Sequence, residues 1–423
     1  MRPWKNVLLA ALFALAVFFF LFKTRAGGEY GDYLPVYGSV RCILDRCNPY
    51  TVSSVAAQML SHGVNPALLN PGFWSNHSML YPPLTYYLLA PLGFFDYGTS
   101  AAIWFWVSAG AFIASCLIFA RLSPNSSRMF VVVALSVVLA TSSDLLRLGQ
   151  VSGITLAFIF TGSILFLTRK YRIAAALTLF IAAGLKPQLA LPILTYFLIP
   201  RESRKYAAGA LAFFVLASIL AMALLTYQTG SAHWVKDLLA ELHAATPVGP
   251  NAPIDTGIIN LEGLTSLISG NAVLYRAVDG CIFAATLALI AVGWLRAKNE
   301  WTRDWVAVAC ISMLTLLLVY HRTYDMRIQV LTFPALGMLW EKSKKTAAVL
   351  TGVGCFLVFS TALVLSRWAV HHFGVHVAHE VLFRIGVERQ QALFALLAAV
   401  GWATASACGQ WRTSQRERPI LQS

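Results

Sequence analysis

Three short polar segments interrupt the apolar runs of this sequence, and they carry side chains that bind anions and move protons. They are residues 142–150, 184–188 and 320–327, whose ionisable members are Asp144, Arg147, Lys186, His321, Arg322, Asp325 and Arg327. Ionisable groups at membrane depth are unfavourable, so they are usually paired or functional. The simpler alternative is that they cap helix ends and extend toward the lipid headgroups. Because the three segments fall on one predicted face, we favour a functional site.

Lys186 lies in the middle of residues 173–199, which are otherwise apolar. Pro187 follows it, and proline breaks a helix and frees backbone groups there. A lysine in such a place requires an anion, and a lipid phosphate is the anion that a membrane enzyme meets; arginine adds bidentate contacts to phosphate. We expect the following side chains to bind this phosphate and its lipid: Lys186, Arg147, Arg322, Gln150 and Gln188.

Two carboxylates, Glu29 and Asp32, follow the first apolar run in a segment rich in glycine and tyrosine. A carboxylate held near the membrane surface can act as a general base, and the glycines allow a ligand to approach closely. The alternative is an interfacial loop within a tyrosine belt. Asp45 is adjacent to Arg46, which favours a surface ion pair there. Asp32 is therefore the candidate base.

Histidines supply a second candidate. His321 shares its segment with Asp325, and we predict that it is a second catalytic residue. His372, His376 and His379 have the spacing of one helix face, but no acidic or cysteine ligand completes a metal set. An interfacial amphipathic helix is therefore favoured over a metal site, and no metal is expected.

Cys42 and Cys47 lie close together in the first predicted outer loop, whereas the other five of the seven cysteines fall in apolar runs. An oxidising outer compartment favours a disulfide between the pair, while a reducing one leaves two free thiols. The cysteines in apolar runs are expected to pack as small apolar residues.

The composition places these residues in a membrane protein. Of the 423 residues, 58% are hydrophobic and only 12% are charged, about half the charged share of a soluble protein. This excludes a water-soluble enzyme, a disordered protein and a disulfide-dense secreted module. The net charge of +14 would indicate a nucleic-acid partner in a soluble protein, but here it marks cytoplasmic loops.

Twelve apolar runs predict an all-α polytopic membrane protein with interfacial helices in its outer loops. The expected spans are residues 7–22, 101–120, 129–143, 145–167, 173–185, 187–199, 207–227, 277–295, 305–320, 328–340, 346–366 and 390–409. The first could be a signal peptide, but Lys23 and Arg25 at the possible cleavage point favour a retained anchor. Residues 81–95 contain three prolines and predict an interfacial or partly re-entrant element.

Loop charges orient the chain. With both termini in the cytoplasm, the inner segments carry the whole net charge of +14, as the positive-inside rule requires. We expect one integral domain over residues 1–423 in the plasma (inner) membrane. The longest loops, residues 23–100 and 228–276, then lie outside, so the active site is expected on the outer or periplasmic face.

After the first span, five motifs follow in a characteristic order. They are Gly31-Asp32-Tyr33 with Tyr37, Asn48-Pro49-Tyr50, Tyr81-Pro82-Pro83-Leu84, Gly149-Gln150-Val151-Ser152 and Lys186-Pro187-Gln188. Over about residues 1–345 the chain resembles glycosyltransferase family 87 of the GT-C superfamily. Its characterised members are polyprenol-phosphate-mannose-dependent α-mannosyltransferases. The family often has Asn where Ser152 stands, which weakens inference about sugar contacts at that position.

The resemblance implies a GT-C-like fold and an inverting sugar transfer without a cofactor. Asp32 matches the acid that deprotonates the acceptor hydroxyl, and fixed cations stabilise the departing lipid phosphate. The partners implied are a polyprenyl-phosphate-sugar donor, a glycan or glycolipid acceptor and membrane lipids. The residues expected to line the sugar and acceptor are Tyr33, Tyr37, Tyr81, Tyr324 and Asp325.

Two other functions stay open from the sequence. A transporter or lipid flippase favours internal repeats and charges near the bilayer midplane, whereas this sequence has no repeat and its charges lie at outer helix ends. A glycan ligase that uses a lipid-diphosphate donor would need more cationic groups at the same face. Sugar transfer from lipid-monophosphate and lipid-diphosphate donors distinguishes these functions.

Overall fold

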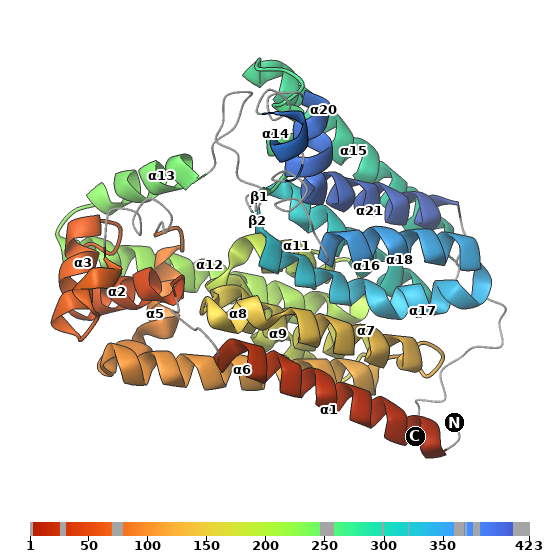
Figure 1. The fold of residues 1–423 in the computed structure, drawn as a ribbon, viewed down its shortest axis with the longest axis horizontal. Helices are drawn as coiled ribbons and strands as arrows, with labels where there is room; N and C mark the ends of the chain where they lie inside the picture. The colour runs from red at the N-terminus through yellow and green to blue at the C-terminus, as the bar shows by residue number, and fades with distance from the viewer. Residues whose placement is uncertain are drawn as a thin grey trace. The chain divides into compact units, whose positions relative to one another are not determined.

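The computed structural model describes residues 3–25, 31–69, 79–245, 258–297, 300–319, 321–358, 368, 370–374 and 381–408. Within these ranges helices dominate, and the only strands are β1 (Ile258–Ile259) and β2 (His321–Arg322) (Figure 1). The strands pair antiparallel, with Ile259 opposite His321. The all-α class predicted from the composition is confirmed.

The chain divides into two compact units. Unit 1 comprises Met1–Leu122 and Leu135–Pro247, and unit 2 comprises Ser123–Ala134 and Val248–Ser423. Helix α7 (Arg128–Thr141) contributes residues to both units.

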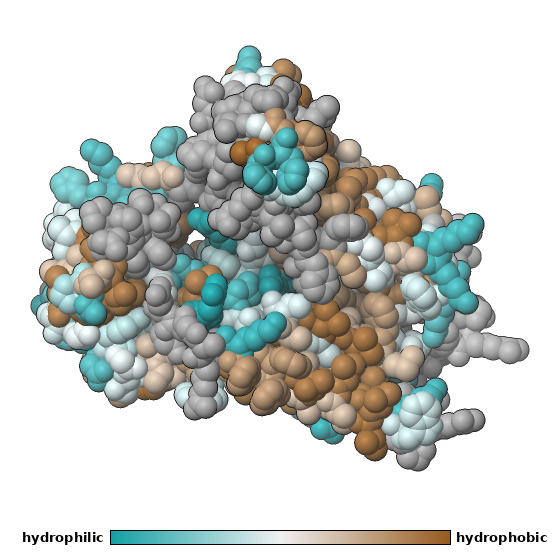
Figure 2. Space-filling view, in the orientation of Figure 1, coloured by the Kyte–Doolittle hydropathy of each residue, from teal (hydrophilic) through white to brown (hydrophobic). Residues whose placement is uncertain are grey.

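Four helices in the described part of the chain are long and apolar enough to cross a membrane. They are α1 (Pro3–Arg25, apolar over Trp4–Lys23), α6 (Tyr97–Leu122), α12 (Arg201–Thr229) and α15 (Ala272–Arg296). On α1 the side chains of Val7, Leu8 and Phe22 are more than half exposed. Figure 2 shows this surface as an apolar band along α1. Such a surface is suited to lipid, so the chain is a membrane protein.

The remaining predicted spans correspond to shorter helices. They are α7, α9 (Val151–Leu167), α10 (Arg172–Leu185), α11 (Pro187–Tyr196), α16 (Glu300–Leu318), α17 (Phe333–Lys342), α18 (Lys344–Val358) and α21 (Gln390–Ala407). A straight crossing needs about 20 residues, and most of these helices are shorter than that. The number of spans therefore stays a prediction.

For two predicted spans, the predicted first residue of the helix was wrong. Residues 145–167 form α8 (Ser143–Arg147) and α9, separated at Gly149, whose φ is +69°. A left-handed residue cannot continue a right-handed helix, so the chain turns there. The span predicted over 328–340 begins instead in the 3-10 helix η3 (Thr323–Thr332), and α-helix starts at α17.

Helix α9 is the centre of unit 1. All of its residues except Phe158 and Thr161 are buried, and it packs against α6 and α10. A helix that is apolar on every side is stable only when other helices surround it. Its first turn therefore offers a fixed platform on which neighbouring segments can be positioned.

The segment of unit 1 between α1 and α6 is mostly helical in its described residues. It contains α2 (Tyr33–Leu44), α3 (Val52–Ser61), η1 (Pro66–Leu68), α5 (Pro83–Leu89) and η2 (Ala90–Phe94). The proline-rich run thus forms two short helices. Helix α13 (His233–Ala245) follows α12 in the same unit. Helix α2, which begins directly after Asp32, packs against α3, α5 and η2.

Unit 2 is organised around α21, which packs against α15, α16 and α18. Gly293 of α15 lies so close to Ser406 of α21 that a Cβ atom would not fit, and the two helices approach closely there. The unit also contains α14 (Leu261–Thr265), α20 (Val381–Phe383) and the π-helical turn η5 (Arg384–Glu388). The β1–β2 pair and η3 contain His321, Asp325 and Arg327.

Candidate active site

Asp32 is fixed to the turn between α8 and α9. It is the N-cap residue of α2, and its backbone N–H donates to the carbonyl oxygen of Leu148 (3.0 Å). Its side chain is half-buried and does not cap α2. Arg147, the residue before Leu148, ends α8 and is exposed. The turn between α8 and α9 thus contains Arg147 and binds the backbone of Asp32.

Aromatic packing holds this turn in place. Nε1 of Trp104 on α6 donates to the carbonyl oxygen of Gly149 (2.9 Å), and the Trp104 ring stacks on Tyr33 at 5.4 Å. The Tyr33 hydroxyl lies 2.6 Å from Oγ of Ser100, and burial raises the pKa of Tyr33 above its ordinary value. These contacts thus fix Tyr33, the residue next to Asp32.

Tyr37 is also part of the core. It is buried, its hydroxyl donates to the carbonyl oxygen of Phe95 (2.8 Å), and burial raises its pKa to about 12. Tyr33 and Tyr37 therefore lie inside unit 1 and not at a surface open to a sugar, which departs from the sequence prediction. Tyr81 is half-buried, and its carbonyl oxygen accepts from the Tyr50 hydroxyl (2.8 Å).

Lys186 separates α10 from α11, as the proline after it predicts. Its side chain is 5% exposed, and Nζ donates to Oγ of Ser152 in the first turn of α9 (2.8 Å). Thr85 of α5 donates through Oγ1 to the carbonyl oxygens of Gly184 (2.9 Å) and Leu185 (3.1 Å). These contacts fix the end of α10 and hence the position of the ammonium group.

The segment 148–152 therefore binds both Asp32 and Lys186. Leu148 holds Asp32 and Ser152 holds Lys186, and a chain of this length spans at most about 14 Å. Gln150, the N-cap residue of α9, lies between Leu148 and Ser152 in the sequence. We call Asp32, Arg147, Gln150 and Lys186 the unit 1 group. Gln188, also predicted to bind phosphate, is half-buried in the first turn of α11.

His321 and Asp325 form a buried pair in unit 2. Because a carboxylate only accepts, Nδ1 of His321 donates to Oδ2 of Asp325 (3.2 Å), which also accepts from the backbone N–H of Arg322 (3.2 Å). Both side chains are fully buried, and no described residue forms a hydrogen bond with Nε2 of His321. We call His321, Arg322 and Asp325 the unit 2 group.

This geometry suits Asp325 to orienting the imidazole of His321. A carboxylate on Nδ1 fixes the tautomer of an imidazole and leaves Nε2 able to accept a proton. Arg322 and Tyr324, which lie between His321 and Asp325 in the sequence, are half-buried. Arg327 is buried, and its guanidinium donates to the carbonyl oxygen of Thr323 (2.9 Å).

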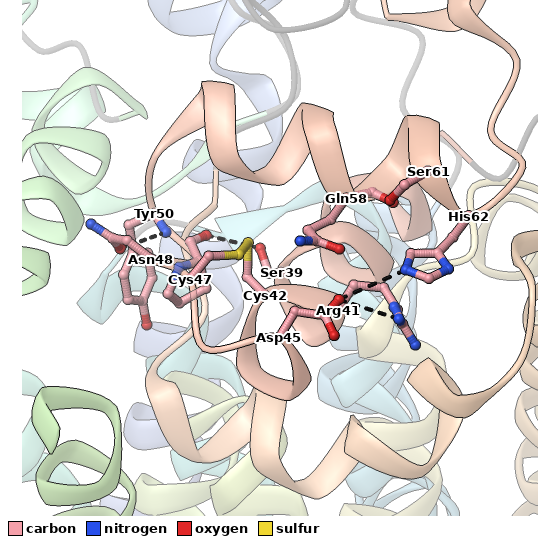
Figure 3. Close-up of a disulfide and its surroundings, with 11 residues drawn as sticks. Ser39, Arg41, Cys42, Asp45, Cys47, Asn48, Tyr50, Gln58, Ser61 and His62 are labelled. Carbon is pink, nitrogen blue, oxygen red and sulfur yellow. Dashed lines mark hydrogen bonds and ion pairs between the residues drawn. A yellow bond between two sulfur atoms is a disulfide. The ribbon is translucent and has the colours of Figure 1, made fainter. Parts of the chain in front are cut away.

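A disulfide joins Cys42 and Cys47, with their Cα atoms 4.6 Å apart (Figure 3). Directly after it, Nδ2 of Asn48 donates to Oδ2 of Asp237 on α13 (2.7 Å). Tyr50 donates to Tyr81 and stacks on Trp234 of α13 at 6.0 Å. The segment after the disulfide is thus tied to α13 and to the Tyr-Pro-Pro-Leu motif.

Asp45 does not pair with Arg46, contrary to the sequence prediction. Its carboxylate lies 3.2 Å from the Arg41 guanidinium and 3.7 Å from Nε2 of His62, as Figure 3 shows. Arg46 has a φ of +59°, in the left-handed region that ends the turn after α2. Asp45 is therefore a surface ion-pair residue, and Asp32 stays the candidate base.

In the described part of the chain, no cluster of three His, Cys, Asp or Glu side chains could hold a metal. His376 and His379 lie outside the described residues, as does Glu29, the other carboxylate near Asp32. The polar groups that the structure does assemble are a carboxylate, cations, an amide and an imidazole. Such a set can move a proton and stabilise a phosphate.

Comparison with known proteins identifies the family. No curated protein and no solved structure matches the chain. Residues 79–320 match glycosyltransferase family 87. This range contains Lys186, the segment 148–152 and most of unit 1, and it covers more than half of the sequence. The resemblance inferred from the motifs is confirmed, and the chain belongs to glycosyltransferase family 87.

Proposed function

We propose that this glycosyltransferase moves a sugar from a polyprenyl-phosphate donor to a hydroxyl of a glycan or glycolipid acceptor, with inversion at the anomeric carbon. Family membership supports sugar transfer, and the apolar helices support a donor that is itself a lipid. The observation that carries the proposal is that segment 148–152 binds both Asp32 and Lys186. A base and a cation are thereby held on one rigid platform.

Asp32, Lys186 and Arg147 of the unit 1 group each have a step in this reaction. The Asp32 carboxylate takes the proton of the acceptor hydroxyl while that oxygen forms a bond to the anomeric carbon. The bond from the anomeric carbon to the phosphate oxygen breaks, and polyprenyl phosphate leaves with the electron pair. Lys186 and Arg147 stabilise the charge on this phosphate. Attack from the face opposite the phosphate inverts the anomeric centre.

The unit 2 group supplies proton transfer or hydrogen bonding in this proposal. His321, oriented by Asp325, acts as a second base or as a hydrogen-bond donor to the sugar or phosphate. Arg322 and Gln188 remain proposed donor contacts, and Tyr324 and Tyr81 remain proposed lining residues. Mannose is the proposed sugar because the resemblance implies it.

The proposed location is the plasma membrane, with both termini in the cytoplasm and the reaction on the outer face. Single cysteines at exposed positions test this orientation in a variant without the native free cysteines. An impermeant thiol reagent in intact cells should label Ala57→Cys on α3 and should not label Lys205→Cys on α12. Labelling of Lys205→Cys alone would contradict the orientation.

Transfer assays test the proposed donor. Purified protein is supplied with radiolabelled sugar on a polyprenyl monophosphate or on a polyprenyl diphosphate, together with glycolipids from native membranes. We expect product from the monophosphate donor only. Product from the diphosphate donor alone would instead identify a ligase. Movement of the lipid across proteoliposomes without product would identify a transporter.

A further inference from the structure

Gln150 has a buried acceptor atom that the fold does not use. Its side chain is 3% exposed, and no described residue donates a hydrogen bond to Oε1. Gln150 occupies the N-cap position of α9, yet its side chain makes no capping hydrogen bond. A buried acceptor without a donor is unfavourable, so its burial needs an explanation outside the fold.

Among the described residues of unit 1, two other buried oxygen atoms also have no hydrogen-bond partner, and they are easier to explain. Ser108 and Ser163 have hydroxyl groups in helices α6 and α9, and a hydroxyl can rotate to donate to a helix carbonyl. An amide oxygen has no proton to donate. Gln150 Oε1 therefore needs a donor that none of the described residues supplies.

The chemistry of the proposed substrates limits which ligand group can do this. The phosphate of a sugar phospholipid carries no proton at neutral pH and only accepts hydrogen bonds. The released lipid phosphate is likewise mainly an acceptor. Sugar hydroxyls donate, so Oε1 is suited to the sugar and not to the phosphate predicted for Gln150 from the sequence.

The position of Gln150 agrees with this assignment. In a displacement with inversion, the sugar ring lies between the attacking hydroxyl and the leaving phosphate. Leu148 holds Asp32, which activates the hydroxyl, and Ser152 holds Lys186, which binds the phosphate. Gln150 lies midway between these two anchor residues in the same segment.

We propose that Oε1 of Gln150 accepts a hydrogen bond from one hydroxyl of the transferred sugar and so determines which sugar is used. This inference rests on the proposed function of the unit 1 group. A site built to bond a substrate hydroxyl strongly rejects the analogue that lacks it, because its own buried group is then left without a partner.

Deoxy donors test the assignment. Polyprenyl phosphates carrying mannose, glucose or arabinose first identify the sugar that the wild-type protein transfers. Each monodeoxy analogue of that sugar is then compared on the wild type and on Gln150→Met, which keeps the length of the side chain and removes the amide. For each donor, kcat/KM of the wild type is divided by kcat/KM of Gln150→Met. The intrinsic reactivity of the donor is the same for both proteins, so it does not affect this ratio.

We expect Gln150→Met to lower kcat/KM about 10- to 100-fold on the complete sugar and less than about threefold on one deoxy donor. Ser163→Ala, a matched change in the same helix, should alter no donor ratio. If Gln150→Met does not fold, Gln150→Asn serves in the same comparison, because it withdraws the amide by one methylene.

Two outcomes would overturn the inference while leaving the proposed function intact. One is an equal loss on every deoxy donor, and the other is no loss on the complete sugar. If the wild-type protein transfers sugar from none of the polyprenyl phosphates, the proposed function fails and this inference fails with it.

Discussion

Lys186 in unit 1 and His321 in unit 2 are both buried ionisable side chains, but they are held by different partners. The Lys186 ammonium donates to the neutral hydroxyl of Ser152, whereas the His321 imidazole donates to the carboxylate of Asp325. A hydroxyl positions a cation without neutralising it. A carboxylate fixes the tautomer and the orientation of the imidazole.

The comparison teaches that Lys186 and His321 are suited to different tasks. Lys186 offers a charge held in place, which suits the stabilisation of a leaving phosphate. His321 offers an oriented nitrogen, which suits the transfer of a proton. Substitutions that remove a cation and substitutions that remove a proton acceptor therefore test whether the two side chains have different tasks.

The largest effect is expected from Asp32→Asn. This change keeps the shape of the side chain and removes its ability to take a proton, so transfer should fall about 100-fold or more while the donor still binds. Rates and donor affinity are measured on the purified protein. Glu29→Gln is the control, and loss of transfer there with activity retained in Asp32→Asn would move the base to Glu29.

Lys186→Met should have the next largest effect. Loss of the cation should lower kcat by about tenfold to a thousandfold, with a smaller change in KM, because the charge on the phosphate builds up as it leaves. Lys236→Met removes an exposed lysine from α13 and should leave kcat unchanged. A near-neutral Lys186→Met would mean that this lysine only extends toward the headgroups.

His321→Gln is expected to lower the transfer rate about 10- to 100-fold. Asp325→Asn should give a similar loss, since it acts through the imidazole. His372→Gln removes an exposed histidine and should have no effect. If His321→Gln stays active while its protein remains folded, the pair is structural and the comparison between the units fails.

The smallest effect is expected from removing the disulfide. Cys42→Ser combined with Cys47→Ser opens a short loop, so the loss of stability should be about 2 kcal/mol or less. We expect a modest decrease in melting temperature and less than a tenfold change in transfer. Asn48→Ala, which removes the contact to Asp237, separates the effect of the crosslink from that of the segment after it.

The sequence could predict the elements that depend on local chemistry. Pro187 predicted that α10 ends and α11 begins at Lys186, and the three prolines of residues 81–95 indicated that this run is not one continuous helix. The polar segment 142–150 indicated a turn, but the next span was predicted to begin at Leu145, whereas α9 begins at Val151. Hydropathy did not separate α8 from α9, because α8 is itself rich in leucine. The beginning of α17 was missed for a related reason, since a 3-10 helix has a similar apolar content.

The contacts that organise the site depend on packing between distant segments. Ser152 is separated from Lys186 by 34 residues, and Trp104 from Gly149 by 45. A serine in an apolar helix gives no signal that a lysine will reach it, so only the motif drew attention to Ser152. The spacing of His321 and Asp325 did suggest a shared site, but which of the two orients the other required the buried geometry.

The break between α10 and α11 also has an electrostatic consequence. Helix α11 begins at Pro187, and the aligned peptide dipoles of a helix place roughly half a positive charge at its first turn. The opposite, negative end of α10 is offset by Thr85, which donates to its last carbonyl oxygens. An anion that approaches Lys186 therefore meets a positive potential that belongs partly to the backbone, and no side-chain substitution at this junction removes that part.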